Sequence, residues 1–407
     1  MPEPGTSSPS ALLRRARFAV GACFFVNAVL YANLVPRFPE VKAELGLSNV
    51  SLGTALAALP LGALLAGLSS AVFIRRFGSA RVASYGLLLL AAAVWAAAAA
   101  PNWLLLAAAL LCAGALDAVV DVAQNAHGLR VQRLYGRSIL NAFHGIWSIG
   151  AVTGGLLGSA AAGLGVPLEV HLAVVGVVFG VPALLGPRAL LAGPDDADRD
   201  GPEGDAADPG SGRPAASRPV RRAAFGAMAA LGVLAICGAF VEDAGASWSA
   251  LYLRDELAAG AALAGLGFVA LQAAMTLGRL TGDRAVDRFG QRRVVRAGGA
   301  LTAAGMGLAL AVPSIPVTLL GFALAGLGVA TLVPAVYHAA DELPGLPRGL
   351  GLAVVNWLLR IGFLVSPPLI GFVADATSLR VALLTVVVAG VGALTFGRVL
   401  PRTVNSG

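Results

Sequence analysis

The chain of 407 residues is 57% hydrophobic and only 13% charged, with a mean hydropathy of +0.80. Soluble domains carry about 25% charged residues, so a water-soluble fold could not bury this much apolar sequence and the solvent must be lipid. The net charge of +7 could suggest nucleic-acid binding, but its distribution along the chain indicates membrane orientation instead. Three cysteines in apolar runs and four scattered histidines predict neither a disulfide framework nor a metal site, and we expect no cofactor.

The first long apolar run extends from Phe18 to Val35, after a polar and basic N-terminus. A signal peptide is the alternative interpretation. The run is longer than the apolar region of a signal peptide, however, and no clear small-residue cleavage site follows it. We therefore predict a first membrane helix.

Further apolar runs follow along the whole chain. A spanning helix needs about 20 mostly apolar residues, and these runs lack the alternation of barrel strands. Twelve segments qualify: 18–36, 50–74, 82–100, 103–127, 139–164, 167–187, 223–250, 260–284, 294–312, 315–339, 349–373 and 378–398.

A stretch rich in Gly, Pro and Asp separates the sixth segment from the seventh. This composition is typical of a disordered linker, and the stretch falls near the middle of the chain, where a fusion of two six-helix halves would place it. The predicted organisation is a tail at 1–17, an N-terminal bundle at 18–190, a linker at 191–222, a C-terminal bundle at 223–398 and a tail at 399–407.

Basic residues are distributed unevenly between the loops. The odd-numbered loops hold only Arg37, Lys42, Arg254 and Arg380, whereas the even-numbered loops and the tails hold nearly all the others. The positive-inside rule then places both termini in the cytoplasm, with the chain in the plasma membrane. Lipid or nucleic-acid binding by the basic loops is the alternative; we favour topology and expect no nucleic-acid partner.

The two halves of the chain repeat one segment at a constant offset. Residues 44–78 align with residues 256–290 without a gap, and Arg76-Phe77-Gly78 falls on Arg288-Phe289-Gly290. A repeated membrane half is typical of two-bundle transporters, whose binding site lies between the halves.

With these features, the chain resembles a transporter of the major facilitator superfamily over nearly its whole length. The most specific mark is the stretch 278–293, which is similar to the cytoplasmic loop motif of the superfamily. The first-half copy is degenerate, with Arg75 in place of the acid, which argues against drug efflux. The resemblance implies that these loops form a gate latch from Asp287, Arg288, Gly290, Arg293, Arg76 and Gly78.

The fourth and fifth segments resemble the fucose permease-like branch of the superfamily. Asp121-Val-Ala-Gln-Asn125 and the polar stretch that begins at Asn141 carry this resemblance. It implies that Asp121, Asn125 and Asn141 serve sugar binding and proton coupling. The branch also uses an acid in the first helix, whereas the matching stretch here has no acid but has Asn33, a candidate solute contact.

Acidic residues within the fourth segment are the strongest candidates for proton coupling. An ionised side chain near the bilayer centre costs at least about 2.5–3.5 kcal/mol, so such residues are functional hypotheses. Asp117 and Asp121 lie one turn apart on one face. Two close carboxylates in a dry site disfavour each other's ionised form, so one of them could gain and lose a proton. His144 could relay that proton. The alternatives are a structural polar pair and a histidine bonded to a helix carbonyl.

Other polar residues in the apolar segments predict a substrate cavity. Glu242 and Asp243 with a following glycine suggest a broken helix at a cavity mouth, unless the helix ends there. Arg360 needs an acid or a substrate anion as its partner, and a structural salt bridge is the alternative. Trp147 could stack on a sugar or fill a bundle contact, and Trp248 is expected at the lipid interface.

We therefore predict an all-α membrane protein with twelve transmembrane helices in two pseudo-symmetric six-helix bundles, the fold of the major facilitator superfamily. The predicted function is secondary active transport by alternating access, with proton-coupled movement of a small polar solute such as a sugar, by a monomer. One alternative is efflux of drugs or amphipathic metabolites by proton antiport. An integral-membrane enzyme and a receptor are further alternatives, but no nucleophile motif or appended domain supports them.

Overall fold

The computed structural model describes residues 11–67, 69–136, 138–193, 218–343 and 350–401, with the side chains of 218–224 excluded. Twelve of its helical segments are long and apolar enough to cross a membrane, as the sequence predicted. The spans are Ala11–Glu44, Asn49–Gly67, Ser79–Ala98, Trp103–Tyr135, Leu140–Gly163, Leu168–Ala189, Phe225–Glu256, Ala261–Phe289, Gln291–Ala311, Ile315–Asp341, Leu350–Ala376 and Leu379–Val399.

The N-terminal bundle contains α1 (Ala11–Ala32), η1 (Val35–Arg37), α2 (Phe38–Glu44), α3 (Asn49–Gly67), α4 (Ser70–Phe77), α5 (Ser79–Ala98), α6 (Trp103–Tyr135), α7 (Leu140–Gly163), α8 (Leu168–Val175), η2 (Gly176–Gly180), η3 (Val181–Leu185) and α9 (Gly186–Ala189). The C-terminal bundle contains α10 (Arg218–Asp243), η4 (Ala244–Trp248), α11 (Ser249–Leu251), η5 (Tyr252–Glu256), α12 (Ala261–Phe289), α13 (Gln291–Ala311), α14 (Ile315–Val329), α15 (Leu332–Asp341), α16 (Leu350–Ala376), α17 (Leu379–Ala382), α18 (Leu384–Phe396) and η6 (Gly397–Val399).

Two boundaries differ from those that the sequence predicted. Helix α1 begins at Ala11, so part of the expected N-terminal tail is helical. Helix α10 begins at Arg218, inside the expected linker. The expected disorder of the rest of that linker falls on residues 194–217, which lie outside the described residues.

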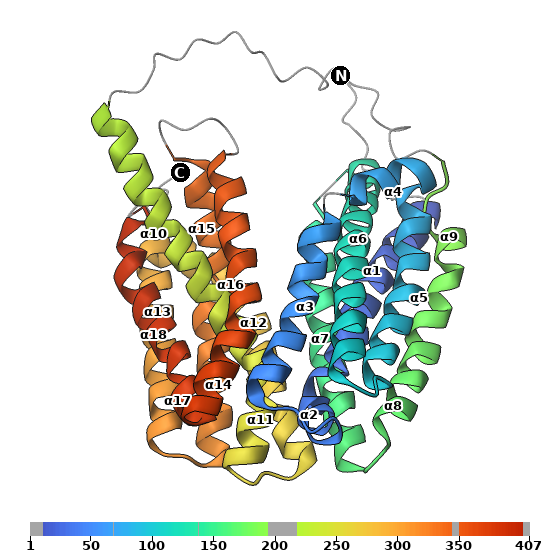
Figure 1. Cartoon of the computed structure of the whole chain (residues 1–407). Coiled ribbons are helices and arrows are strands. Elements are labelled where there is room, and N and C mark those ends of the chain that lie inside the picture. Colours follow the sequence, from blue (N-terminus) through green and yellow to red (C-terminus); the bar gives the residue numbers. More distant parts are fainter. Residues whose placement is uncertain (1–10, 68, 137, 194–217, 344–349, 402–407) are drawn as a thin grey trace.

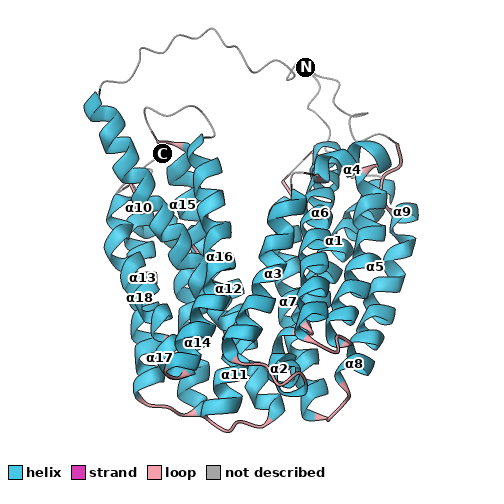
Figure 2. Ribbon diagram, viewed as in Figure 1, coloured by secondary structure: helices cyan, strands magenta, loops and turns pink. Residues whose placement is uncertain are grey.

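The two bundles stand side by side and are tilted toward each other (Figure 1). They diverge toward the end at which α1 begins and η6 ends, which we call the proximal end, and converge at the opposite, distal end. Every regular element that the structure describes is helical, with short connections (Figure 2).

The repeat in the sequence is also a repeat in backbone conformation. Gly78 and Gly290, which follow α4 and α12, have φ values of 83° and 80°, and each N–H donates to a carbonyl four residues earlier at 2.8 Å. A side chain would strain the backbone at such a φ, so glycine is required in both copies. Gly114 and Gly326 likewise pack against the carbonyls of Leu59 and Leu271, at the same offset.

Glycines bring the backbones of the two bundles into contact at the distal end. A Cβ atom on Gly53 of α3 would collide with the carbonyl of Pro367 in α16, and one on Gly371 of α16 would collide with the carbonyl of Asn49. On the other side of the interface, Gly155 of α7 packs against Phe268 of α12. These contacts close the distal end and leave the space between the bundles on the proximal side.

Candidate functional site

A cavity of about 500 Å³ lies between the bundles and is lined by both of them. Such a volume is within the usual range for small-molecule sites. Spans 1, 2, 4 and 5 of the N-terminal bundle and spans 7, 8, 10 and 11 of the C-terminal bundle form most of its wall. The polar lining residues are Asn27, Tyr31, Asp117, Trp147, Glu242, Asp243, Ser247, Gln272, Tyr337, Asn356 and Arg360.

Three of these residues form a hydrogen-bonded chain in the N-terminal bundle. The Trp147 indole Nε1–H donates to Asn27 Oδ1 at 2.9 Å, and Asn27 Nδ2 donates to Asp117 Oδ1 at 2.8 Å. Asn27 is buried, and its amide joins α1 to both α6 and α7. These hydrogen bonds fix the Asp117 carboxylate in the cavity wall. The second carboxylate oxygen of Asp117, Oδ2, takes no part in them.

Asp121 lies one turn along α6 from Asp117 and is not among the residues that line the cavity. Its Oδ1 accepts from Asn125 Nδ2 at 2.9 Å and from Gln124 Nε2 at 3.3 Å. His144 and Arg360 are both close enough to act on its charge. Asp121 and Asn125 are thus together, as the sequence suggested, but beside the cavity rather than in its wall.

Three predicted residues lie away from the cavity wall. His144 is exposed on α7, and its ring packs edge-on against Phe24 at 5.3 Å. Asn141 is exposed one turn closer to the proximal end. Asn33 is fully buried, with its amide donating to the Val29 carbonyl at 2.8 Å.

Asp243 is the buried carboxylate of the C-terminal bundle. Its Oδ1 accepts from the Ser247 hydroxyl at 2.8 Å. The Ser366 hydroxyl of α16 interacts with the same carboxylate but lies outside hydrogen-bonding geometry. Asp243 Oδ2, Ser366 Oγ and Gln272 Nε2 are therefore buried with no hydrogen-bond partner among the described residues.

Span 7 is continuous, which corrects the predicted break after Glu242 and Asp243. The helix widens instead into two π-helical stretches, Ala244–Trp248 and Tyr252–Glu256. Such π turns insert a residue without ending the helix and occur often at functional sites. Trp248 is 0% exposed, so its predicted place at the lipid interface was also wrong. It belongs to the buried hydrophobic core.

Two charged residues complete the cavity wall. Glu242 Oε2 lies 3.7 Å from Arg279 Nη2 of α12, in a loose and half-exposed ion pair. Arg360 of α16 makes no ion pair or side-chain hydrogen bond within the described part of the chain. The candidate acids Asp117, Asp121 and Asp243 form no ion pair with it, so its guanidinium faces the cavity and interacts with Asp121 only at a distance.

The latch residues flank the proximal ends of α4 and α12. Asp287, Arg288 and Arg293 are exposed, and in the described structure neither Asp287 nor Arg293 forms an ion pair. Arg76 and Arg288 each lie over the phenylalanine that follows, at 5.7 and 5.4 Å. This geometry fits a latch that is open while the bundles are apart at this end.

Sequence reasoning missed several residues of the site. Asn27 and Tyr31 are four residues apart on the cavity face of α1, and a lone Asn in an apolar run was the available signal. Gln272 was a similar signal in span 8. Asn27 and Gln272 are each a single uncharged residue in an apolar segment, so they were less conspicuous than the acidic residues.

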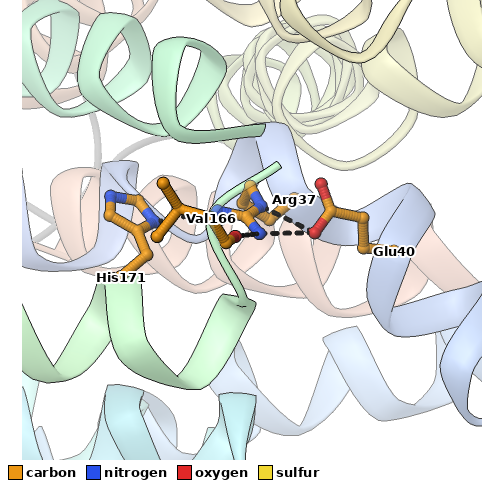
Figure 3. A network of polar contacts seen from close by, with 4 residues as sticks. All are labelled: Arg37, Glu40, Val166 and His171. Atoms are coloured by element: carbon orange, nitrogen blue, oxygen red, sulfur yellow. Dashed lines mark hydrogen bonds and ion pairs between the residues drawn. The ribbon is translucent and has the colours of Figure 1, made fainter. Parts of the chain in front are cut away.

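A buried polar network at the distal end was also missed (Figure 3). Arg37 is 1% exposed, and its guanidinium donates to Glu40 Oε2 at 2.5 and 2.9 Å and to the Val166 carbonyl at 2.6 Å. Its Nη1 lies 3.2 Å from His171 Nδ1. Because arginine can only donate, Nδ1 accepts, and Nε2–H of a neutral His171 donates to Asn33 Oδ1 at 3.1 Å. Asn33 is thus part of this network.

Two bundles of six spans around a shared polar cavity define a two-bundle membrane transporter. Residues 20–248 and 231–406 match the Major Facilitator Superfamily. The chain is 31% identical over 365 residues to an uncharacterized MFS-type transporter of Yersinia pestis, which covers 88% of this chain and 89% of the relative. It is 30% identical over 378 residues to the membrane protein MosC of Rhizobium meliloti, at 92% and 87% coverage. The chain therefore belongs to the Major Facilitator Superfamily and is a multi-pass membrane transporter of small molecules rather than an enzyme.

Solved structures share the fold at low sequence identity. A mutant of the nucleoside transporter NupG superposes with a TM-score of 0.74 at 14% identity, over 95% of this chain and 100% of that chain. A bacterial homolog of the human lysosomal transporter Spinster, inward-facing and unoccupied, gives a TM-score of 0.74 at 15% identity, over 97% and 98%. At these identities the likeness establishes the fold alone.

Proposed function

We propose that this transporter couples protons to the movement of a small polar solute such as a sugar, in the manner of the fucose permease-like branch. The observation that supports this proposal most is the convergence of carboxylates, amides, an arginine and a tryptophan on one cavity of about 500 Å³. Alanine, leucine and phenylalanine side chains also line the cavity, as an amphipathic drug would require, so what favours a polar solute is the set of donors and acceptors that both bundles present.

The proposed proton site is the Asp117–Asp121 pair of α6. Asp117 is in the cavity wall with one oxygen held by Asn27, and Asp121 is one turn toward the proximal end, near His144. Protonation would remove a charge from a partly desolvated site, and the proton could leave through the open proximal side. His144 is the proposed relay between Asp121 and the water at that end.

The proposed solute contacts come mainly from the C-terminal bundle. Arg360 and Gln272 Nε2 offer donors to the cavity, and Asp243 Oδ2 offers an acceptor, none of which has a partner in the described structure. Trp147 presents a ring on the opposite wall, with its nitrogen already bonded to Asn27. Donors, an acceptor and a ring face suit the hydroxyls and the apolar face of a sugar. Glu242, Asn125 and Asn141 are proposed to contact the solute in other states of the cycle, and Asn33 to support α1 in its register.

The proposed orientation has both termini in the cytoplasm of a cell whose plasma membrane holds the protein. It rests on the concentration of arginine in the tails and the even-numbered loops. The proximal end would then be cytoplasmic, and the open space between the bundles would face inward.

Transport by purified protein in proteoliposomes tests the proposal. With a panel of labelled sugars and polyols and an imposed pH gradient, wild-type protein should accumulate one of them above its equilibrium level. Asp117→Asn keeps the bond from Asn27 but cannot be deprotonated, so we expect it and Asp121→Asn to lose uphill accumulation and keep solute exchange.

Asp341→Asn is the matched control, because Asp341 is an exposed acid at the end of α15 outside the cavity. It should accumulate solute as the wild type does. Uphill transport that survives in both α6 variants would disprove the proton site. Proton-driven export of cationic dyes without any sugar transport would favour the efflux alternative instead.

A further inference from the structure

A second hollow lies on the membrane-facing side of the N-terminal bundle, between α1, α7 and the end of α6. Its volume is about 540 Å³, and it shares no lining residue with the central cavity. We call it the α1–α7 groove, and its main lining residues are Arg14, Arg17, Ala22, Phe25, Tyr135 and Ile146. The ring of Phe25 lies 6.2 Å from that of Phe179 in span 6, a peripheral span that contributes nothing to the central cavity.

The groove has a charged end and an apolar body. Arg14 and Arg17 lie at the start of α1 and line this end of the groove. Below them the wall is apolar, and Phe18, which also lines the groove, is 81% exposed on the side that faces the membrane. Gly21 gives the groove its depth, because a Cβ atom there would stand 3.1 Å from Ile146 Cδ1.

Arg17 is held in position at the rim. It donates from Nη1 to the Tyr135 hydroxyl at 3.2 Å, and its guanidinium lies over the Tyr135 ring at 5.2 Å from the centroid. A guanidinium carries five N–H donors in a rigid fork, so stacking on one ring leaves donors for an oxyanion. The side chain has therefore already lost much of the freedom that binding would remove.

The length of the groove matches one leaflet of a bilayer. It extends along α1 from Arg14 to Val26, which at 1.5 Å per residue is about 18 Å. Half of the hydrocarbon core is about 15 Å thick, so the groove spans a headgroup region and most of an acyl chain. Basic pockets between membrane helices are known binding sites for anionic headgroups.

We propose that the α1–α7 groove binds an anionic glycerophospholipid, with its phosphate on Arg17 and one acyl chain along Ala22, Phe25 and Ile146. The bound lipid packs behind the face of α1 and α7 that carries Asn27 and Trp147. It thereby holds α1 and α7 in position against each other from the membrane side. This support does not depend on which solute the protein carries.

Lipid binding to the purified full chain tests this proposal without any transported solute. Native mass spectrometry and thermal unfolding would compare phosphatidylglycerol with phosphatidylcholine of the same acyl chains. The wild type should retain the anionic lipid preferentially and unfold at a higher temperature in its presence. Arg17→Gln should weaken that preference by about fivefold, which is the factor for one basic residue near an anionic surface.

Two more variants separate the headgroup from the chain. Ala22→Trp fills the apolar body at an exposed position and should reduce binding of both lipids. Arg133→Gln removes an exposed arginine at the same end of α6 but outside the groove, and should behave as the wild type. Equal retention of both lipids by the wild type, or an unchanged preference in Arg17→Gln, would overturn the proposal. So would an equal thermal shift with glycerol phosphate alone, because that would define a free-phosphate site.

Discussion

At the scale of single residues, the site depends on helix contacts that only glycine permits. Helix α7 lies so close to α1 that a Cβ atom on Gly154 would stand 2.8 Å from both the Ala32 Cβ and the Val29 carbonyl. This contact carries Trp147 of α7 to Asn27 of α1. Small residues let membrane helices approach closely, but the helix that these glycines contact is visible only in the structure.

Gly154→Ala should therefore destabilise the protein, because neither the Ala32 Cβ nor the backbone carbonyl can move without shifting α1. Overpacking of this kind costs about 1–3 kcal/mol. Gly145→Ala in the same helix is the control, since nothing lies within 4 Å of its added Cβ, and it should be neutral or slightly stabilising. Thermal unfolding of the two purified variants checks the difference, and equal melting temperatures would contradict it.

The direction in which a side chain points was the least predictable feature at this scale. Asp117 and Asp121 were expected on one face, yet only Asp117 reaches the cavity wall. Trp248 is interior, and the π turn in which it lies leaves no signature in the composition of span 7. Asn33 is a predicted solute contact, but His171, from a distant span, holds its amide oxygen. Such orientations depend on tertiary packing and not on local sequence.

At the scale of elements, the twelve spans could be predicted because apolar length and the repeat are both written directly in the sequence. The contacts between the bundles could not be predicted from the sequence. The carboxylate of Asp375, at the end of α16, accepts from the backbone N–H groups of Asn49 and Val50 at 2.9 and 2.8 Å. One bundle thus caps the first turn of α3 in the other bundle, next to the ion pair between Lys42 and Asp255 at 2.9 Å.

Asp375→Asn should weaken the distal closure, because a neutral amide interacts less well with a helix N-terminus and this cap joins the two bundles. Loss of a cap is worth about 1 kcal/mol, or roughly a fivefold change in the population of the distal-open state. Spin labels at the exposed positions Leu164 and Val312, one in each bundle, would report it as a larger long-distance population in pulsed dipolar measurements.

Glu256→Gln is the matched control for this prediction. Glu256 Oε1 accepts from the N–H of Leu379 at 3.1 Å, so it caps α17 within the C-terminal bundle. Its loss should lower stability without changing the distance between the bundles. An unchanged distance distribution in Asp375→Asn, or an equal change in both variants, would show that the inter-bundle cap does not hold the distal end.

At the scale of the whole molecule, the two ends are unlike in what holds them. The distal end is closed by backbone packing of α3 on α16, a cap and an ion pair, whereas Asp287 and Arg293 at the proximal end are exposed and form no ion pair in the described structure. The shared glycines Gly78 and Gly290 keep the same turn in both halves, but only the second copy has an acid, Asp287. Asp287 at the proximal end and the inter-bundle cap at the distal end are therefore proposed to oppose each other in one equilibrium.

This opposition predicts the direction in which Asp287→Asn shifts the equilibrium between the two states. If Asp287 stabilises the state in which the proximal end is closed, Asp287→Asn should reduce the population with an open distal end. The distance between labels at Leu164 and Val312 should then shift toward the short component, opposite to the shift in Asp375→Asn. Because the two sites are at opposite ends and share no contacts, their free-energy effects should add, and the double variant should return toward the wild-type distribution. A shift in the same direction for both single variants would mean that Asp287 does not act as a latch on the proximal end.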